Sequence, residues 1–218
     1  MANQPGFHEV PAECYKRLRQ ICCHPGLIDA DSVDKPSAKL EALLELLEPL
    51  VQEGRKVLVF SQFVGVIEIL QRAPKRRCST MSCTTSSLAA REWPHFVLTG
   101  QTEDRGQLVQ EFQQCAGPAV FLLSLKASGF GLNLTAASYV VLYDPWWNPA
   151  VENQAIDRTH RIGQTSTVFA YRLIIKESIE EKIRALQKQK RALADDILGE
   201  EAFARALTLE DLKHLLAE

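Results

Sequence analysis

Apolar positions recur at helical spacing in two early parts of the chain, and both parts have recognisable ends. Residues 13–23 keep this spacing until His24-Pro25-Gly26, because the residue before a proline is disfavoured in the α conformation. A second helix is predicted to begin after Ser37, an N-cap residue, and to end at Gly54, which readily adopts a left-handed conformation. Pro49 is expected to kink this helix near its end.

Short apolar runs then alternate with helical patterns. The runs predict buried strands at Val57–Phe60, Ala119–Leu125, Tyr139–Tyr143 and Val168–Ile175. Helical patterns lie between them, among others at Glu103–Gln114, with Thr102 as a possible N-cap, and at Ala150–Arg158. This alternation predicts an α/β fold, doubly wound, with a mainly parallel sheet and helices on both faces.

A further amphipathic helix is predicted from Ser178 to about Leu198. Apolar side chains form one stripe along it, and Glu180 and Arg184 are spaced four apart on the other side. Its basic residues could contact phosphates, although a solvated polar face is the commoner arrangement. A short helix is also predicted at Thr208–Leu216.

Residues 73–92 fit neither period. Pro74–Ser87 is polar and rich in Ser and Thr, and it interrupts the helix predicted at Val64–Arg72. A disordered insertion is therefore expected here. The basic residues 75–77 could bind DNA, although an unstructured solvated loop is the commoner explanation.

Composition restricts the class of protein. The chain has 218 residues, of which 46% are hydrophobic, and this is enough for one core with a helical appendage. With a net charge of −2, any DNA contact must come from local basic patches. No apolar run approaches the ~18 residues that span a bilayer, and no signal segment is recognised, so we expect an intracellular protein with no membrane partner.

The cysteines have two possible interpretations. Six cysteines without the spacing of a secreted disulfide framework predict reduced thiols. Zinc binding by Cys14, Cys22, Cys23 and His24 is an alternative, but the spacing typical of zinc ligands is missing. Buried cysteines on an apolar helix face are the simpler interpretation, so no metal site is predicted.

The strongest chemical signal is the segment Gln154–Gln164. Arg158 and Arg161 are three apart at the end of a predicted helix, and such a pair can neutralise charge on a transferring phosphoryl group. The chain has no glycine-rich loop ending in Gly-Lys-Ser/Thr and no acidic metal-holding motif. The arginine pair therefore lacks the rest of a nucleotide site within these 218 residues.

Two loops after predicted strands could meet a ligand. In Leu125–Leu134, glycines permit close backbone approach and Lys126 and Ser128 could bind a phosphate, although glycines required only for a tight turn explain the loop equally well. The loop Asp144–Pro149 begins at the carboxyl end of a strand, where ligands gather in open α/β sheets. One of its two tryptophans is expected in the core, and the other is expected to be exposed as a stacking surface for nucleic acid.

Five motifs in this order resemble the second RecA-like lobe of the Swi/Snf-type ATPases, helicase-like proteins of superfamily two that translocate on double-stranded DNA. They are Phe60–Phe63, Leu98–Thr102, Ser124–Leu134, Asp144–Pro149 and Gln154–Gln164. Leu18–Pro25 and Ser37–Leu40 also resemble the start of that lobe. The resemblance divides the chain into an N-terminal helix and linker (1–36), the lobe (37–176) and C-terminal brace helices (177–218), with 73–92 atypical and with a strand at His95–Leu98.

The resemblance implies a site shared with another lobe. Arg158 and Arg161 match the family's paired arginine fingers, which reach the γ-phosphate of ATP. Gly129 and Gln154 match residues near the nucleotide. ATP and Mg²⁺ would be held mainly by the first lobe, which this chain lacks.

The resemblance also implies contacts with DNA. Lys126 and Ser128 match a loop that tracks the phosphate backbone, and Trp147 matches a tryptophan that touches DNA. Thr99 and Gly100 match a turn that contacts the backbone. Asp157 and His160 also match, and we interpret them as structural supports.

The expected function is that of the second lobe of a DNA translocase, related to chromatin remodelling motors and inactive without its first lobe. The alternatives are a non-catalytic nucleic-acid-binding lobe or an inactive fragment of a longer ATPase. The compact chain with its short acidic tail suggests a bacterial, cytoplasmic protein on the nucleoid; a eukaryotic one would be nuclear.

Overall fold

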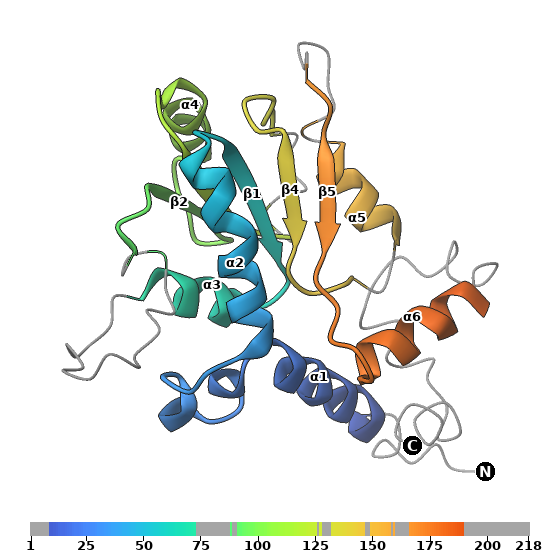
Figure 1. The fold of residues 1–218 in the computed structure, drawn as a ribbon. Helices are drawn as coiled ribbons and strands as arrows, with labels where there is room; N and C mark the ends of the chain where they lie inside the picture. Colours follow the sequence, from blue (N-terminus) through green and yellow to red (C-terminus); the bar gives the residue numbers. More distant parts are fainter. Residues whose placement is uncertain are drawn as a thin grey trace.

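The computed structural model describes residues 9–72, 88, 91–125, 127, 132–146, 149–157, 159 and 166–189. Within these ranges the strands are β1 (Lys56–Ser61), β2 (His95–Leu98), β3 (Ala119–Ser124), β4 (Tyr139–Leu142) and β5 (Phe169–Arg172). They form one parallel sheet in the order β2-β3-β1-β4-β5. Figure 1 labels β2, β1, β4 and β5 in this order across the view. The predicted α/β fold with a parallel sheet is confirmed.

The strand positions follow the apolar runs closely, and β2 lies at the strand that the family resemblance implied. The central strands β1 and β3 are buried almost throughout. The edge strand β5 differs, because it is shorter than the predicted run Val168–Ile175 and Phe169 and Tyr171 are exposed. Among the described strands, β4 alone pairs with β5, and this pairing covers four residues.

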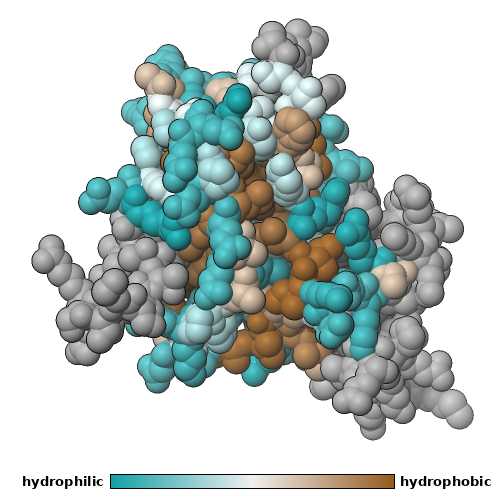
Figure 2. All heavy atoms as spheres, in the orientation of Figure 1, coloured by the Kyte–Doolittle hydropathy of each residue, from teal (hydrophilic) through white to brown (hydrophobic). Residues whose placement is uncertain are grey.

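Helices cover both faces of the sheet. They are α1 (Glu9–Cys23), α2 (Ala38–Gln52), α3 (Val64–Gln71), α4 (Arg105–Gln114), α5 (Pro149–Ile156) and α6 (Ile179–Gln189), with short 3₁₀ helices η1 (Pro25–Leu27) and η2 (Ala30–Ser32). One apolar core lies between the sheet and helices α2 and α3, and a second lies on the other face with side chains of α4 and α5. Polar side chains follow the outward side of α2, with apolar residues beside it (Figure 2).

The predicted helix boundaries hold in part. Ser37 is the N-cap of α2, although its hydroxyl donates to the carbonyl of Cys23 (3.1 Å) instead of capping the helix. The helix continues past Pro49, and Gly54 after it has a φ of 76°. Thr102 is not the N-cap of α4, because Asp104 holds that position.

The end of the atypical stretch 73–92 is packed against the core. Leu88 is fully buried, and its backbone N–H donates to the carbonyl of Leu70 in α3 (3.0 Å). Arg91 forms an ion pair with Glu48 of α2 (3.0 Å). The prediction of disorder is therefore wrong at these positions, while residues 73–87 and 89–90 lie outside the described residues.

The predicted C-terminal helix is described as far as Gln189. Its expected extension to Leu198 and the helix expected at Thr208–Leu216 lie outside the described residues. In the described part of the chain, no helix is both long and apolar enough to cross a membrane.

Candidate functional site at the carboxyl edge of the sheet

All five described strands are parallel, so the loops that follow them leave from one edge of the sheet. Thr99 and Gly100 follow β2 at this edge, and Asp144 follows β4. Lys126, Ser128, Gly129 and Trp147 belong to the loops after β3 and β4 and themselves lie outside the described residues. The fold thus brings to one edge the loops that the sequence analysis selected separately.

The edge contains a topological switch point between β1 and β4. The chain leaves β1 through α3 toward β2, whereas it leaves β4 through α5 toward β5 on the opposite side. Open α/β sheets bind ligands at such a point. Here the carboxylate of Asp144, only 1% exposed, lies beside β1 and accepts from the Ser61 hydroxyl (2.6 Å) and the backbone N–H of Gln62 (3.0 Å).

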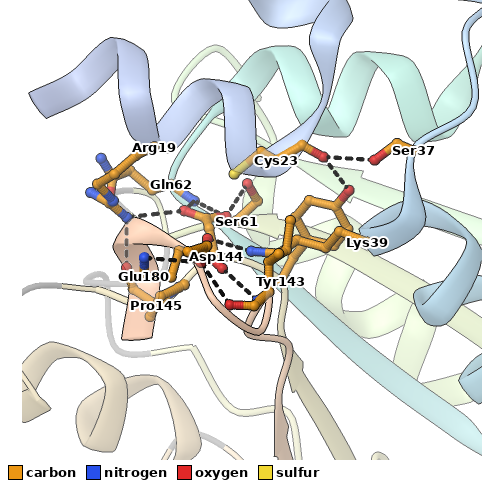
Figure 3. A network of polar contacts seen from close by, with 12 residues as sticks. Arg19, Cys23, Ser37, Lys39, Ser61, Gln62, Tyr143, Asp144, Pro145 and Glu180 are labelled. Carbon is orange, nitrogen blue, oxygen red and sulfur yellow. Dashed lines mark hydrogen bonds and ion pairs between the residues drawn. The ribbon is translucent and has the colours of Figure 1, made fainter. Parts of the chain in front are cut away.

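Arg19 of α1 is also buried at this point (Figure 3). Its Nη2 lies 3.7 Å from Oδ2 of Asp144 and donates to the carbonyl of Pro145 (2.6 Å). Burial raises the pKa of Asp144, while Arg19 and the donors from Ser61 and Gln62 oppose that shift by stabilising the carboxylate. The ion pair therefore ties the first helix to the loop that carries the two tryptophans.

A second buried ion pair joins Lys39 of α2 to Glu180 of α6. Glu180 also accepts from the backbone N–H of Ile175 (3.0 Å). The predicted location of Glu180 on the polar side of its helix, paired with Arg184, is wrong, because α6 lies against the first helices and buries this carboxylate. Nearby, the Tyr143 hydroxyl donates to the carbonyl of Cys23 (2.9 Å), and burial raises the pKa of Tyr143.

Helix α5 leads from the tryptophan loop toward the arginine pair. Gln154 is exposed on it, as a residue facing a ligand must be. Beyond its end, Thr159 is fully buried, and both its backbone N–H and its hydroxyl donate to the carbonyl of Ile156 (2.9 and 2.6 Å). Arg158 and Arg161 lie outside the described residues, but the backbone on both sides of Arg158 belongs to this anchored segment.

Glu152 of α5 is a residue that sequence reasoning did not select. It is 5% exposed and accepts from the backbone N–H of Trp146 (2.8 Å) and from Nε of Arg172 in β5 (2.7 Å). Trp146 itself is 8% exposed, which confirms that one tryptophan of the pair belongs to the core. The predicted exposure of Trp147 falls outside the described residues.

The turn at Thr99 and Gly100 is compact and open to solvent. The backbone N–H of Thr99 donates to the hydroxyl oxygen of Thr102 (3.0 Å), and the carbonyl of Gly100 accepts from Arg105 (3.1 Å). A Cβ at Gly100 would meet no atom within 4 Å. A large partner can therefore approach the backbone of this turn.

The described residues hold no group of three or more His, Cys, Asp or Glu side chains arranged to bind a metal ion. Cys23 is fully buried, and burial raises its pKa well above the usual range. This keeps the thiol protonated and makes it a poor metal ligand.

The chain has clear relatives among known proteins. Residues 38–163 match the model of the helicase conserved C-terminal domain. The chain is 37% identical over 204 residues to the putative ATP-dependent helicase/translocase YwqA of Bacillus subtilis, covering 91% of this chain and 21% of that protein. It is 40% identical over 182 residues to the DNA repair protein RAD5 of Cryptococcus neoformans, covering 82% of this chain and 14% of that protein. It therefore spans 14–21% of the length of these two relatives.

Two solved structures are similar over nearly the whole chain. The Sulfolobus solfataricus SWI2/SNF2 ATPase core in complex with dsDNA is 29% identical with a TM-score of 0.74, covering 98% of this chain and 43% of that chain. The C-terminal domain of the same ATPase is 28% identical with a TM-score of 0.72, covering 98% of this chain and 84% of that chain.

Proposed function

Because the chain belongs to the helicase conserved C-terminal domain family and is homologous to the C-terminal lobe of Snf2-family ATPases, we propose that it is the second lobe of an ATP-dependent translocase on double-stranded DNA. The observation that carries the proposal is the convergence of the loops after β2, β3 and β4 on one edge of the sheet. Helix α5, which precedes the arginine pair, begins directly after one of these loops.

The nucleotide contacts follow from this assignment. Arg158 and Arg161 would act as arginine fingers on the γ-phosphate, and Gly129 and Gln154 would lie near the nucleotide. ATP and Mg²⁺ would be held mainly by a first RecA-like lobe, in the same longer protein or in a separate one. Two observations support these roles, namely the exposure of Gln154 and the anchoring of the following backbone at Thr159.

The DNA contacts would come from Thr99, Gly100, Lys126, Ser128 and Trp147. The open turn at Gly100 supports this, because a phosphate can approach its backbone without a steric barrier. The net charge of −2 gives no general attraction to DNA, so these local contacts would have to supply the binding.

The test combines this chain with the first lobe of the Bacillus subtilis relative and measures DNA-stimulated ATP hydrolysis. We expect no hydrolysis by this chain alone and turnover when the lobes are mixed. Arg161→Ala should lower kcat by roughly 10³–10⁵-fold, the usual contribution of an arginine finger. Glu48→Gln, which changes a residue of α2 that pairs with Arg91, is the control and should leave kcat unchanged.

Two results would contradict the proposal. Hydrolysis by the chain alone would show that it needs no other lobe. Salt-dependent duplex binding that Arg158→Ala leaves unchanged, with no turnover in any lobe mixture, would instead favour a non-catalytic nucleic-acid-binding lobe.

A further inference from the structure

One peptide group in the loop after β4 is held on both sides by buried charges. The carbonyl of Pro145 accepts from the guanidinium of Arg19 (2.6 Å), and the N–H of Trp146 donates to the carboxylate of Glu152 (2.8 Å). A peptide dipole is negative at its oxygen and positive at its N–H. Each buried charge therefore faces the end of the Pro145–Trp146 peptide that it stabilises.

Each of these charges also has an opposite charge beside it. Asp144 lies 3.7 Å from Arg19, and Arg172 donates to the second oxygen of Glu152 (2.7 Å). The four side chains, two positive and two negative, lie as one pair at each end of this peptide group. They connect α1, the loop after β4, α5 and β5. We call these four side chains, together with the Pro145–Trp146 peptide, the peptide clamp.

Stability alone does not explain the peptide clamp. Removing charges from water costs free energy, and apolar residues of similar size are often as stabilising as a buried ion pair. What the charges add is direction, because hydrogen bonds on both sides of a peptide fix the orientation of its plane. The clamp therefore fixes the orientation of the backbone immediately before Trp147.

The clamp also fixes the orientation of α5. This helix is only eight residues long, so a few contacts determine its rotation about its own axis. Glu152 and Ala155 are its described buried side chains, and Gln154 is exposed beside them. Arg158 follows Glu152 by six residues, and the chain between them contains the end of α5.

We propose that Glu152 is a positioning residue for the proposed site, acting through the peptide clamp to fix the orientation of α5, the helix that precedes the arginine pair in the chain. This inference rests on the proposed function, since it concerns the same site. Glu152 is not assigned any contact with nucleotide or DNA. Its removal should therefore affect the rate of turnover more than the binding of either ligand.

The experiment uses the lobe mixture described above and compares Glu152→Ala with Glu152→Gln. Glu152→Ala removes both hydrogen bonds and should lower kcat by about 10²-fold, the effect of a misplacement of about 1 Å. The KM for ATP and the half-saturating duplex concentration should change by less than about threefold, because ground-state binding is retained. Glu152→Gln keeps an acceptor for the Trp146 N–H but loses the ion pair. Its kcat should therefore lie between that of the unmodified chain and that of Glu152→Ala.

A control variant tests the loss of a carboxylate at a more exposed ion pair. Glu48→Gln removes a carboxylate from another long-range ion pair, between α2 and Arg91 (3.0 Å), away from the peptide clamp. It should leave kcat unchanged. If Glu152→Ala does not fold, Glu152→Gln carries the comparison. A kcat within about threefold of the unmodified chain for the folded variants would overturn the inference.

Hydrogen exchange on this chain alone gives a second readout. Glu152→Ala should speed exchange at the Trp146 amide and in α5 without affecting β1 and β3, whereas Glu152→Gln should keep the Trp146 amide protected. Uniformly faster exchange would indicate simple destabilisation and contradict a positioning role.

The inference about Glu152 and the proposed function can be contradicted separately. If Arg161→Ala retains turnover, the proposed function is wrong. If Arg161→Ala loses turnover and Glu152→Ala retains it, only the positioning role of Glu152 is contradicted.

Discussion

At the scale of single residues, the molecule buries charged and polar side chains that have partners far along the chain. Arg19 and Asp144 are each 1% exposed, although 125 positions separate them. An unpaired charge at such a site would be strongly unfavourable. Each partner therefore depends on the other, and the stability of the site depends on a contact between the first helix and the loop after the fourth strand.

Asp144→Asn tests this dependence. The amide keeps an acceptor for Ser61 and Gln62, but Arg19 loses its counter-charge, so the free energy of unfolding should fall by about 3–5 kcal/mol. Urea denaturation gives the value. Glu13→Gln, in an exposed pair with Arg17, should change it by less than about 1 kcal/mol. Equal effects of the two substitutions would contradict the role given to Arg19.

His24 gives a dependence on pH. It is 1% exposed, its Nδ1 accepts from the backbone N–H of Gly26 (3.0 Å), and burial lowers its pKa. Because the folded state binds the proton less readily, its contribution to stability is present above the unfolded pKa of about 6.5 and is lost as pH falls below it. His24→Asn keeps an acceptor without titrating there. The stability advantage of the unmodified chain over this variant, measured by urea denaturation, should therefore shrink between pH 7.5 and 5.5; a constant difference would contradict the assignment.

At the scale of elements, the N-cap of helix α4 lies two residues after the N-cap predicted from the sequence. The carboxylate of Asp104 accepts from the backbone N–H of Gln107 (2.9 Å) and caps the helix. Thr102, also a good N-cap residue type, is instead used inside the preceding turn, where it accepts from Thr99. The turn after β2 and the cap of α4 are therefore built from neighbouring residues.

Asp104→Ala should lower the free energy of unfolding by about 1 kcal/mol through loss of the cap. The neighbouring exposed substitution Glu103→Ala should change it by less than about 0.5 kcal/mol. Thermal denaturation of both variants checks the prediction. A larger effect at Glu103 than at Asp104 would mean that the helix begins elsewhere.

Most elements could be predicted from the sequence because their signals are local. The apolar runs located four of the five strands, and a proline or a glycine marked the ends of α1 and α2. The roles of Arg19, Glu152 and Glu180 could not be predicted in this way, because each depends on partners from other elements. One usable signal was present, since Arg19 lies four residues from both Tyr15 and Cys23, on the buried face of α1.

At the scale of the whole molecule, the first and last described helices are joined at the carboxyl edge. Lys39 of α2 and Glu180 of α6 form a buried ion pair, and α6 also contacts α1. These contacts hold α1, α2 and α6 together beside the edge of the sheet that carries the candidate site. Loss of one charge should therefore destabilise a region far larger than one helix.

Lys39→Met alone should lower the free energy of unfolding by about 3–5 kcal/mol, because Glu180 stays buried without its cation. Adding Glu180→Gln should recover much of the loss, since the amide can still accept from Ile175 and no charge remains. Urea denaturation of both variants checks this. If the second substitution lowers the free energy of unfolding further, the unpaired charge of Glu180 is not the cause of the first loss.

The strand order also determines how late in translation the central strand of the sheet can pair with its neighbours. Strand β1 lies at the centre, yet its neighbours β3 and β4 end about 60 and 80 residues later in the chain. At synthesis rates of about 5–20 residues per second, the apolar stretch Val57–Phe60 waits several seconds before both of its edges are paired. During that interval this apolar stretch has neither of its neighbouring strands, and such unpaired strands are exposed to chaperones and to aggregation.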